Sequence, residues 1–407
     1  MRGRRCTGGK RRSGSERVEF GLVISDKLKP FGTTIFSEMT RLSNEHSAIN
    51  LSQGFPDFDG PPGIIEAAAD AMRAGHNQYA RSMGHPALVE AIAAKVYEHH
   101  GLRYDPLREV VVFSGATEGI ASSLLGILNP GDEVILFEPF YDSYPACVAM
   151  AGAVPRYYTL RFPSFSINPA ELEALFTKRT RLLVINSPNN PTGKVYNRAE
   201  LEAISNLCQK HGVLVLADEV YEHLTYGENR HIPMATLPGM RDRTLAISST
   251  GKTFSLTGWK IGWGVGPESM VAAAQAAHQF VTFATSTPFQ VAMAFALKSY
   301  TRDYLEKLHD EYTARRDFLV EVLEEVGFKV APPQGTYFAL ADFSRLSKDD
   351  DRVFARSLIE RHGVAAIPPS VFYQDDPDEG RRLLRFAFCK RMETLEAAAK
   401  RLRGLKG

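Results

Sequence analysis

The sequence predicts an α/β fold in which a mostly parallel sheet with one reversed strand is followed by a smaller α+β domain. In the middle of the chain, apolar strand-like runs alternate with helical patterns. The runs are nearly continuous in Val, Ile and Leu, as expected when helices cover both faces of a parallel sheet. After about residue 290 the pattern changes to a long helical stretch and then short strands.

The link over residues 249–260 indicates the reversed strand. It is too short for the helical crossover of about a dozen residues that a parallel return needs, and it contains Gly251 and Gly258. The run 261–265 is therefore predicted to be antiparallel to its predecessor. The other strands are predicted at 110–113, 133–137, 182–186, 213–217 and 244–247, with helices at 119–128, 169–176 and 199–211.

The C-terminal part has a different organisation. One helical stretch is predicted over 288–326, ending before Gly327, then strands at 336–341 and 383–388 and helices at 353–362 and 392–402. Four segments follow from this: a disordered basic extension (1–17), an N-terminal segment packing with the small domain (18–61), a large α/β domain (62–290) and a small α+β domain (291–407).

The overall composition excludes several classes. The net charge is +1, with 44% apolar and 23% charged residues, so the chain is neither disordered nor, as a whole, a nucleic-acid binder. No apolar run approaches the length of a membrane helix. Residues 1–17 carry seven basic residues against Glu16; a disordered extension is the first interpretation and a basic arm the alternative.

The cysteines and histidines predict no metal site. The four cysteines are spread along the chain without a CxxC pair, and the eleven histidines form no HExxH or Cys/His cluster. A cysteine content this low predicts no disulfide framework and favours a reducing cytoplasm.

Small and amide residues follow two predicted strands at the sheet edge where ligands of open α/β sheets bind. Gly115, Ala116 and Thr117 separate one strand from a helix, and the free N–H groups of a helix start suit a phosphate. Asn190 lies in Ser-Pro-Asn-Asn-Pro-Thr-Gly, where two prolines fix the backbone around a side-chain amide. A turn without a ligand is the alternative for both.

Ionisable residues follow the next two strands. Asp218 ends a buried strand and needs a cation or donors as partners unless it caps a helix, and Tyr221 follows one turn later. Lys252 lies in a tight loop of small residues, where desolvation and the nearby Lys260 would lower its pKa and make it nucleophilic; a solvated loop lysine is the alternative. Arg385 interrupts an apolar strand and either faces water or grips a carboxylate.

Taken together, these groups match one cofactor and one kind of substrate. A phosphate cradle, a buried carboxylate, a phenol with an amide, and an activated amine are the partners of the phosphate, ring nitrogen, phenolic oxygen and aldehyde of pyridoxal 5′-phosphate (PLP). A guanidinium would then hold the carboxylate of an amino acid.

The chain resembles the class I/II aminotransferases of PLP fold type I, in the branch that holds kynurenine/glutamine, methionine and succinyldiaminopimelate aminotransferases. The resemblance covers roughly residues 30–405. It implies a seven-stranded sheet, a homodimer with shared active sites, and transfer of an amino group from an L-amino acid to a 2-oxo acid. The motifs that carry it are 49–57 (Ile-Asn-Leu-Ser-Gln-Gly-Phe-Pro-Asp), 77–79 (Asn-Gln-Tyr), 187–193, 218–221 and 249–262.

The resemblance also implies residue roles. Lys252 forms the internal aldimine and then shuttles the substrate proton, Asp218 keeps the ring nitrogen protonated, and Tyr221 contacts the phenolic oxygen. Lys260 stands where the general family has arginine, a feature of the kynurenine-type branch. The remaining positions are Gly115, Ala116, Thr117, Tyr141, Asn190 and Ser249 for the cofactor, Tyr79 for the partner subunit's phosphate, and Gly54, Asn190 and Arg385 for the substrate carboxylate.

Alternatives remain for activity and for substrate. A carbon–sulfur β-lyase would use the same lysine, whereas a non-catalytic PLP-binding regulator would need a DNA-binding module for which residues 1–17 are too short. An acidic long-chain substrate such as succinyldiaminopimelate would require an extra cation. An apolar or aromatic substrate is the other interpretation, favoured by Phe36, Phe55, Tyr141, Phe372 and Tyr373.

Overall fold

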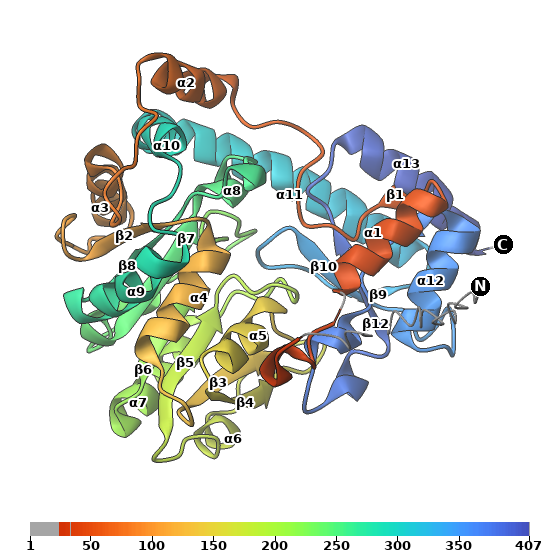
Figure 1. Cartoon of the computed structure of the whole chain (residues 1–407). Coiled ribbons are helices and arrows are strands. Elements are labelled where there is room, and N and C mark those ends of the chain that lie inside the picture. Colours follow the sequence, from red (N-terminus) through yellow and green to blue (C-terminus); the bar gives the residue numbers. More distant parts are fainter. Residues whose placement is uncertain (1–23, 33, 407) are drawn as a thin grey trace, which may run out of the picture.

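A seven-stranded sheet forms the centre of the protein, which is described here from a computed structural model for residues 24–32 and 34–406. The strand order is β2-β8-β7-β6-β5-β3-β4, and only β8 runs antiparallel to its neighbours, which confirms the predicted reversed strand (Figure 1). The strands are β2 (Val110–Phe113), β3 (Glu133–Glu138), β4 (Val154–Thr159), β5 (Thr180–Asn186), β6 (Leu214–Asp218), β7 (Thr244–Ser249) and β8 (Gly262–Val265).

Helices cover both faces of this sheet, which explains the continuous apolar runs. In β3, Val134 and Leu136 belong to one core cluster and Ile135 and Phe137 to another, so this strand buries both of its faces. On these faces lie α4 (Ala116–Ile127), α5 (Ser143–Met150), α6 (Pro169–Glu173), α7 (Arg198–His211) and α9 (Glu268–Val281). A third cluster, beside β2 and β8, includes residues of α2 (Pro62–Arg73), α3 (Pro86–His100) and α10 (Thr287–Ser299).

Strand β4 has no counterpart among the strands derived from apolar runs. Among the described strands it pairs only with β3 and lies at the sheet edge, where its side chains are mostly half-buried and Pro155 is tolerated. Its sequence, Val-Pro-Arg-Tyr-Tyr-Thr, therefore lacks the apolar run that marks a central strand.

The single helical stretch predicted over 288–326 is wrong, because the structure divides it into α10 and α11 (Arg302–Glu325). The break falls at Tyr300 and Thr301, where the Tyr300 ring packs against Phe254 and Tyr304. Helix α10 stays with α2 and α3, whereas α11 crosses to the C-terminal strands, so one straight helix could not reach both partners (Figure 1).

The C-terminal part holds two further sheets. An antiparallel sheet has the order β12-β10-β9, and β1 pairs in parallel with β11, which joins the N-terminal segment to the C-terminal part. Figure 1 shows α1 (Ile35–Glu45) beside α12 (Asp351–His362). The other elements are β1 (Ile49–Asn50), β9 (Lys329–Ala331), β10 (Phe338–Asp342), β11 (Val364–Ala365), β12 (Leu383–Ala387) and α13 (Met392–Leu402).

Two absences concern the described residues alone. No helix among them is long and apolar enough to cross a membrane. No group of three or more His, Cys, Asp or Glu side chains in this part of the chain is arranged to hold a metal ion. Residues 1–17, predicted to be a basic extension, lie outside the described residues.

Candidate active site

A cavity of about 270 Å³ opens at the carboxyl ends of the central strands. Because Asn186, Asp218 and Ile247 are neighbours across β5, β6 and β7, the residues that follow these strands meet at one sheet edge. Most of the predicted site residues line this cavity: Gly54, Gly115, Ala116, Thr117, Tyr141, Asp218, Tyr221, Ser249, Lys252 and Lys260.

Asp218 is a buried carboxylate at the cavity floor. Its Oδ2 accepts a 2.6 Å hydrogen bond from the Tyr144 hydroxyl, and its Oδ1 accepts one of 3.3 Å from the Val220 N–H. Burial nevertheless raises the pKa of Asp218 to about 6. The carboxylate therefore lacks a full counter-charge and suits a cationic ring nitrogen. Tyr144 was missed in the sequence because nothing near it marks its hydroxyl as a partner of a residue 74 positions away.

Lys252 faces the same cavity from the short helix α8 (Thr250–Thr253), directly after β7. Burial lowers the pKa of its amine to about 8, so a much larger fraction is neutral and nucleophilic near neutral pH than for an ordinary lysine. The amine donates a 2.8 Å hydrogen bond to the hydroxyl of Tyr337, a second residue that the sequence did not indicate.

The start of α4 has the geometry of a phosphate cradle. Gly115 precedes the helix with φ +82° and has no side chain to cap the first N–H groups. A Cβ on Gly262 would lie 2.6 Å from the Ala116 nitrogen, so this glycine keeps the helix start accessible. Lys260, in the left-handed conformation with φ +55°, brings its side chain beside Gly115. The donors present therefore fit a phosphate group.

Arg385 and Asn190 lie together beside this cavity. Arg385 is buried, and it donates hydrogen bonds to Asn190 Oδ1 at 3.0 Å and to the carbonyl of Ser52 at 2.9 Å. Its Nε has no hydrogen-bond partner among the described residues. Burial lowers the pKa of Arg385 to about 10, and the rings of Phe36, Phe338 and Phe372 surround the guanidinium.

Tyr79 is the predicted site residue that lies away from the cavity. It lies outside the cavity lining, with 83% of its surface exposed, and packs edge-on against Phe283 with ring centroids 5.1 Å apart.

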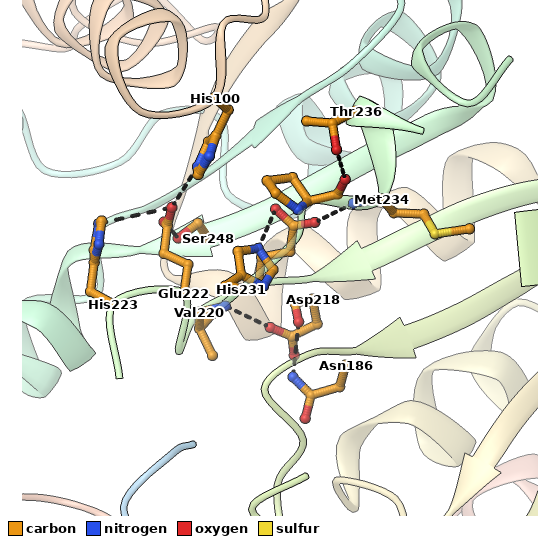
Figure 2. Close-up of polar contacts among 12 residues, drawn as sticks. His100, Asn186, Asp218, Val220, Glu222, His223, His231, Met234, Thr236 and Ser248 are labelled. Carbon is orange, nitrogen blue, oxygen red and sulfur yellow. Dashed lines mark hydrogen bonds and ion pairs between the residues drawn. The ribbon is translucent and has the colours of Figure 1, made fainter. Parts of the chain in front are cut away.

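The segment that carries Asp218 and Tyr221 is anchored from behind by two buried carboxylates that sequence reasoning missed. Glu219 accepts a hydrogen bond from the Met234 N–H and lies 3.4 Å from His231. Glu222 does not line the cavity and contacts Ser248, His100 and His223 (Figure 2). Residues 218–222 alone carry no signal for these roles, because the partners Met234 and His100 lie at distant positions in the sequence.

Glu222 also forms a buried ion pair with Lys95 of α3 at 2.7 Å. Burial alone would raise the pKa of Glu222, but Lys95 and the neighbouring histidines lower it well below its ordinary value. Replacing Lys95 by methionine is expected to destabilise the protein by about 3–5 kcal/mol, because it leaves a buried carboxylate without its main cation. Urea unfolding measures this cost.

The double variant Lys95→Met/Glu222→Gln is the matched control for that prediction. It removes both charges and should recover most of the lost stability. A cost below about 1 kcal/mol for Lys95→Met alone would contradict the view of this pair as a buried anchor.

The fold and the cavity place the protein among the PLP-dependent α/β enzymes. Comparison with known proteins narrows this class to one family: residues 46–402 match aminotransferase class I and II, and the chain belongs to that family. It is therefore an enzyme that transfers amino groups between amino acids and 2-oxo acids, with PLP as its cofactor.

Individual relatives are similar to this chain over nearly its full length. A probable N-succinyldiaminopimelate aminotransferase of Mycobacterium tuberculosis is 46% identical over 390 residues, covering 92% of this chain and 97% of the relative. A kynurenine–oxoglutarate transaminase of Dictyostelium discoideum is 38% identical over 418 residues, covering 94% and 96%. The solved structure of Escherichia coli YbdL, described as having a methionine aminotransferase function, has a TM-score of 0.91 at 41% identity and covers 94% and 100%.

Proposed function

We propose that Lys252, Asp218 and Tyr221 are the catalytic residues of this aminotransferase. Bound PLP supplies an aldehyde that condenses with amino groups and a ring that accepts an electron pair. Lys252 holds the reactive amine and moves the proton at the substrate Cα, for which its lowered pKa is suited. Asp218 would pair with the ring nitrogen, and Tyr221, which lines the same cavity, would donate to the phenolic oxygen.

The remaining cavity residues would hold and orient the cofactor. The N–H groups of Ala116 and Thr117 at the start of α4, with Gly115, Ser249 and Lys260, surround the place of the phosphate. Tyr141 lines the cavity where it can stack on the ring. The observation that carries this assignment is the common cavity that Asp218 and Lys252 share with the helix start.

Substrate binding is assigned to Arg385, Asn190 and Gly54. The Nε of Arg385, unpartnered among the described side chains, is free to donate to a carboxylate. Because Asn190 Oδ1 is used by Arg385, its amide nitrogen remains available as a donor. Gly54 lines the cavity, and the Ser52 carbonyl two residues earlier accepts the hydrogen bond from Arg385.

We further propose a homodimer with shared active sites, located in the cytoplasm. The exposed Tyr79 packs against Phe283, and Phe280, which is 86% exposed, and Val281 lie just before Phe283 in the chain; these exposed apolar side chains suit contact with a second copy of this chain. There Tyr79 would reach the phosphate of the partner's cofactor. The low cysteine content of the sequence supports the cytoplasmic location.

An apolar or aromatic amino donor fits the site best. Three phenylalanine rings surround Arg385, Phe55 lines the cavity, and the lysines in its lining are Lys252 and Lys260, both already assigned. Among the described residues, that lining offers no further cation to pair with a second substrate carboxylate. Tyr373, expected to help line the site, instead directs its hydroxyl to the Leu160 carbonyl.

A panel of amino donors tests this function. With a 2-oxo acid as acceptor, methionine, phenylalanine and kynurenine should give kcat/KM values at least about 10-fold above aspartate and N-succinyldiaminopimelate, since a second carboxylate would be desolvated without a partner. Oxo-acid formation is measured by chromatography. Faster turnover of the two acidic donors would contradict the substrate assignment.

The same panel separates transamination from β-elimination. The names of the relatives favour transamination. Cystathionine should therefore react only when a 2-oxo acid is added. Release of pyruvate and ammonia without an acceptor, at a rate equal to transamination, would identify a lyase instead.

A further inference from the structure

Tyr337 is a fully buried tyrosine held in a rigid backbone directly before β10. Its carbonyl accepts a 2.9 Å hydrogen bond from the Phe388 N–H. The preceding residue, Thr336, has φ +64° and is bonded through its N–H to the Leu224 carbonyl and through its carbonyl to the Tyr226 hydroxyl. The backbone therefore fixes where the Tyr337 ring enters the site.

The hydroxyl of Tyr337 joins two separate parts of the active site. It donates a 2.6 Å hydrogen bond to the carbonyl of Gly54 and accepts one of 2.8 Å from the Lys252 amine. Its ring packs edge-on against Tyr221, with centroids 5.2 Å apart at 89°. Because the single hydroxyl hydrogen is used toward Gly54, the oxygen faces Lys252 as an acceptor. The neutral amine then binds through an N–H and keeps its lone pair free.

We propose that Tyr337 is the positioning residue for the Lys252 amine, and that it couples this amine to the Gly54 loop that receives the substrate carboxylate. The inference rests on the proposed roles of Lys252 and Gly54. A long lysine side chain has several rotatable bonds, and proton transfer at Cα requires its nitrogen at one place. A fixed acceptor 2.8 Å from that nitrogen supplies this constraint.

A purely structural tyrosine is the competing explanation, because a buried hydroxyl needs partners for its own sake. The two explanations differ in what removal of the hydroxyl changes. A structural role alters stability only. A positioning role alters the protonation of the Lys252 amine and the proton-transfer step, while the cavity itself keeps its shape.

Tyr337→Phe tests the proposal, with Tyr196→Phe as the matched control. Tyr196 is equally buried, and its hydroxyl has no partner within the described part of the chain. The first readout uses the cofactor-free protein: Lys252 is modified with trinitrobenzenesulfonate over a pH series and quantified by mass spectrometry. Loss of the acceptor should lower the midpoint of Lys252 modification by about one pH unit, since the hydrogen bond favours the ammonium form.

The second readout uses the cofactor-loaded enzyme. In Tyr337→Phe, kcat should fall about 10- to 100-fold, with an increased isotope effect for an α-deuterated donor because proton transfer becomes slower. The visible absorption of the cofactor should persist. Unchanged modification midpoint and isotope effect would overturn the proposal, whereas absence of visible absorption from the unmodified enzyme would overturn the proposed function instead.

A second variant covers the case in which Tyr337→Phe does not fold. Site-specific 3-fluorotyrosine at position 337 keeps the shape of the ring and makes the oxygen a weaker acceptor. It should shift the Lys252 midpoint in the same direction by a smaller amount. An unchanged midpoint there would equally contradict a positioning role.

Discussion

Replacing Lys252 by alanine is expected to remove the visible absorption of the cofactor-loaded protein and to lower turnover by about 10⁴-fold or more. The variant lacks the amine that we propose captures the cofactor aldehyde and moves the substrate proton. The other lysine of the cavity lining, Lys260, lies beside Gly115 at the start of α4. Spectra, and the mass of the chain after borohydride reduction, measure the loss directly.

Lys298→Ala is the control, since this lysine is exposed on α10 and outside the cavity. It should keep both the spectrum and the turnover. A borohydride-stable adduct of the Lys252→Ala chain with PLP would show that another amine holds the cofactor, and the assignment of Lys252 would fail.

Asp218→Asn is expected to have opposite effects on activity and on stability. Turnover should fall about 10²- to 10³-fold, because an amide does not stabilise a protonated ring nitrogen as a carboxylate does. The cofactor-free protein should become more stable by about 3 kcal/mol above pH 7, since burial raises the pKa of this carboxyl from 3.8 to about 6 and the ionised form is costly in the fold.

The raised pKa of Asp218 also determines how the stability gain of Asp218→Asn depends on pH. The unfolded chain ionises this carboxyl near its ordinary pKa, whereas the folded protein ionises it only near pH 6. The stability gain of Asp218→Asn should therefore be full above pH 7, fall as the pH drops through 6, and vanish below about pH 3. Urea unfolding of the cofactor-free protein at several pH values measures it. Asp242→Asn, at an exposed aspartate, serves as control; a gain for Asp218→Asn that does not depend on pH would contradict the buried-carboxylate explanation.

The sequence predicted the central sheet well because its strands bury both faces and so appear as apolar runs. Strand β4 was not predicted, because an edge strand can keep polar residues and Pro155 and so lacks an apolar run. The division of α10 from α11 also escaped, because it depends on the different partners of the two helices and not on a strong breaker between them.

The cavity could be predicted where its residues follow strand ends, as Asp218 and Lys252 do. Tyr337 and Tyr144 could not, since their contacts with Lys252 and Asp218 join positions 85 and 74 residues apart. Glu222 could not be predicted either. Its partner Lys95 lies on α3, which packs beside β2 and β8, and only the folded chain brings the two residues together.

The pairing of β1 with β11 joins a stretch near the start of the described chain to one near its end. Leu51, just after β1, is also bonded to β12 by the Ala387 N–H, so Gly54 and Arg385 belong to one unit built from both ends of the chain. Lys252 and Asp218 belong to the central sheet. On the proposed roles, Gly54 and Arg385 come from the two terminal stretches, whereas the cofactor contacts and Asn190 come from the central ones. Recombining the terminal stretches among relatives therefore offers a route to new donor preferences on an unaltered catalytic base.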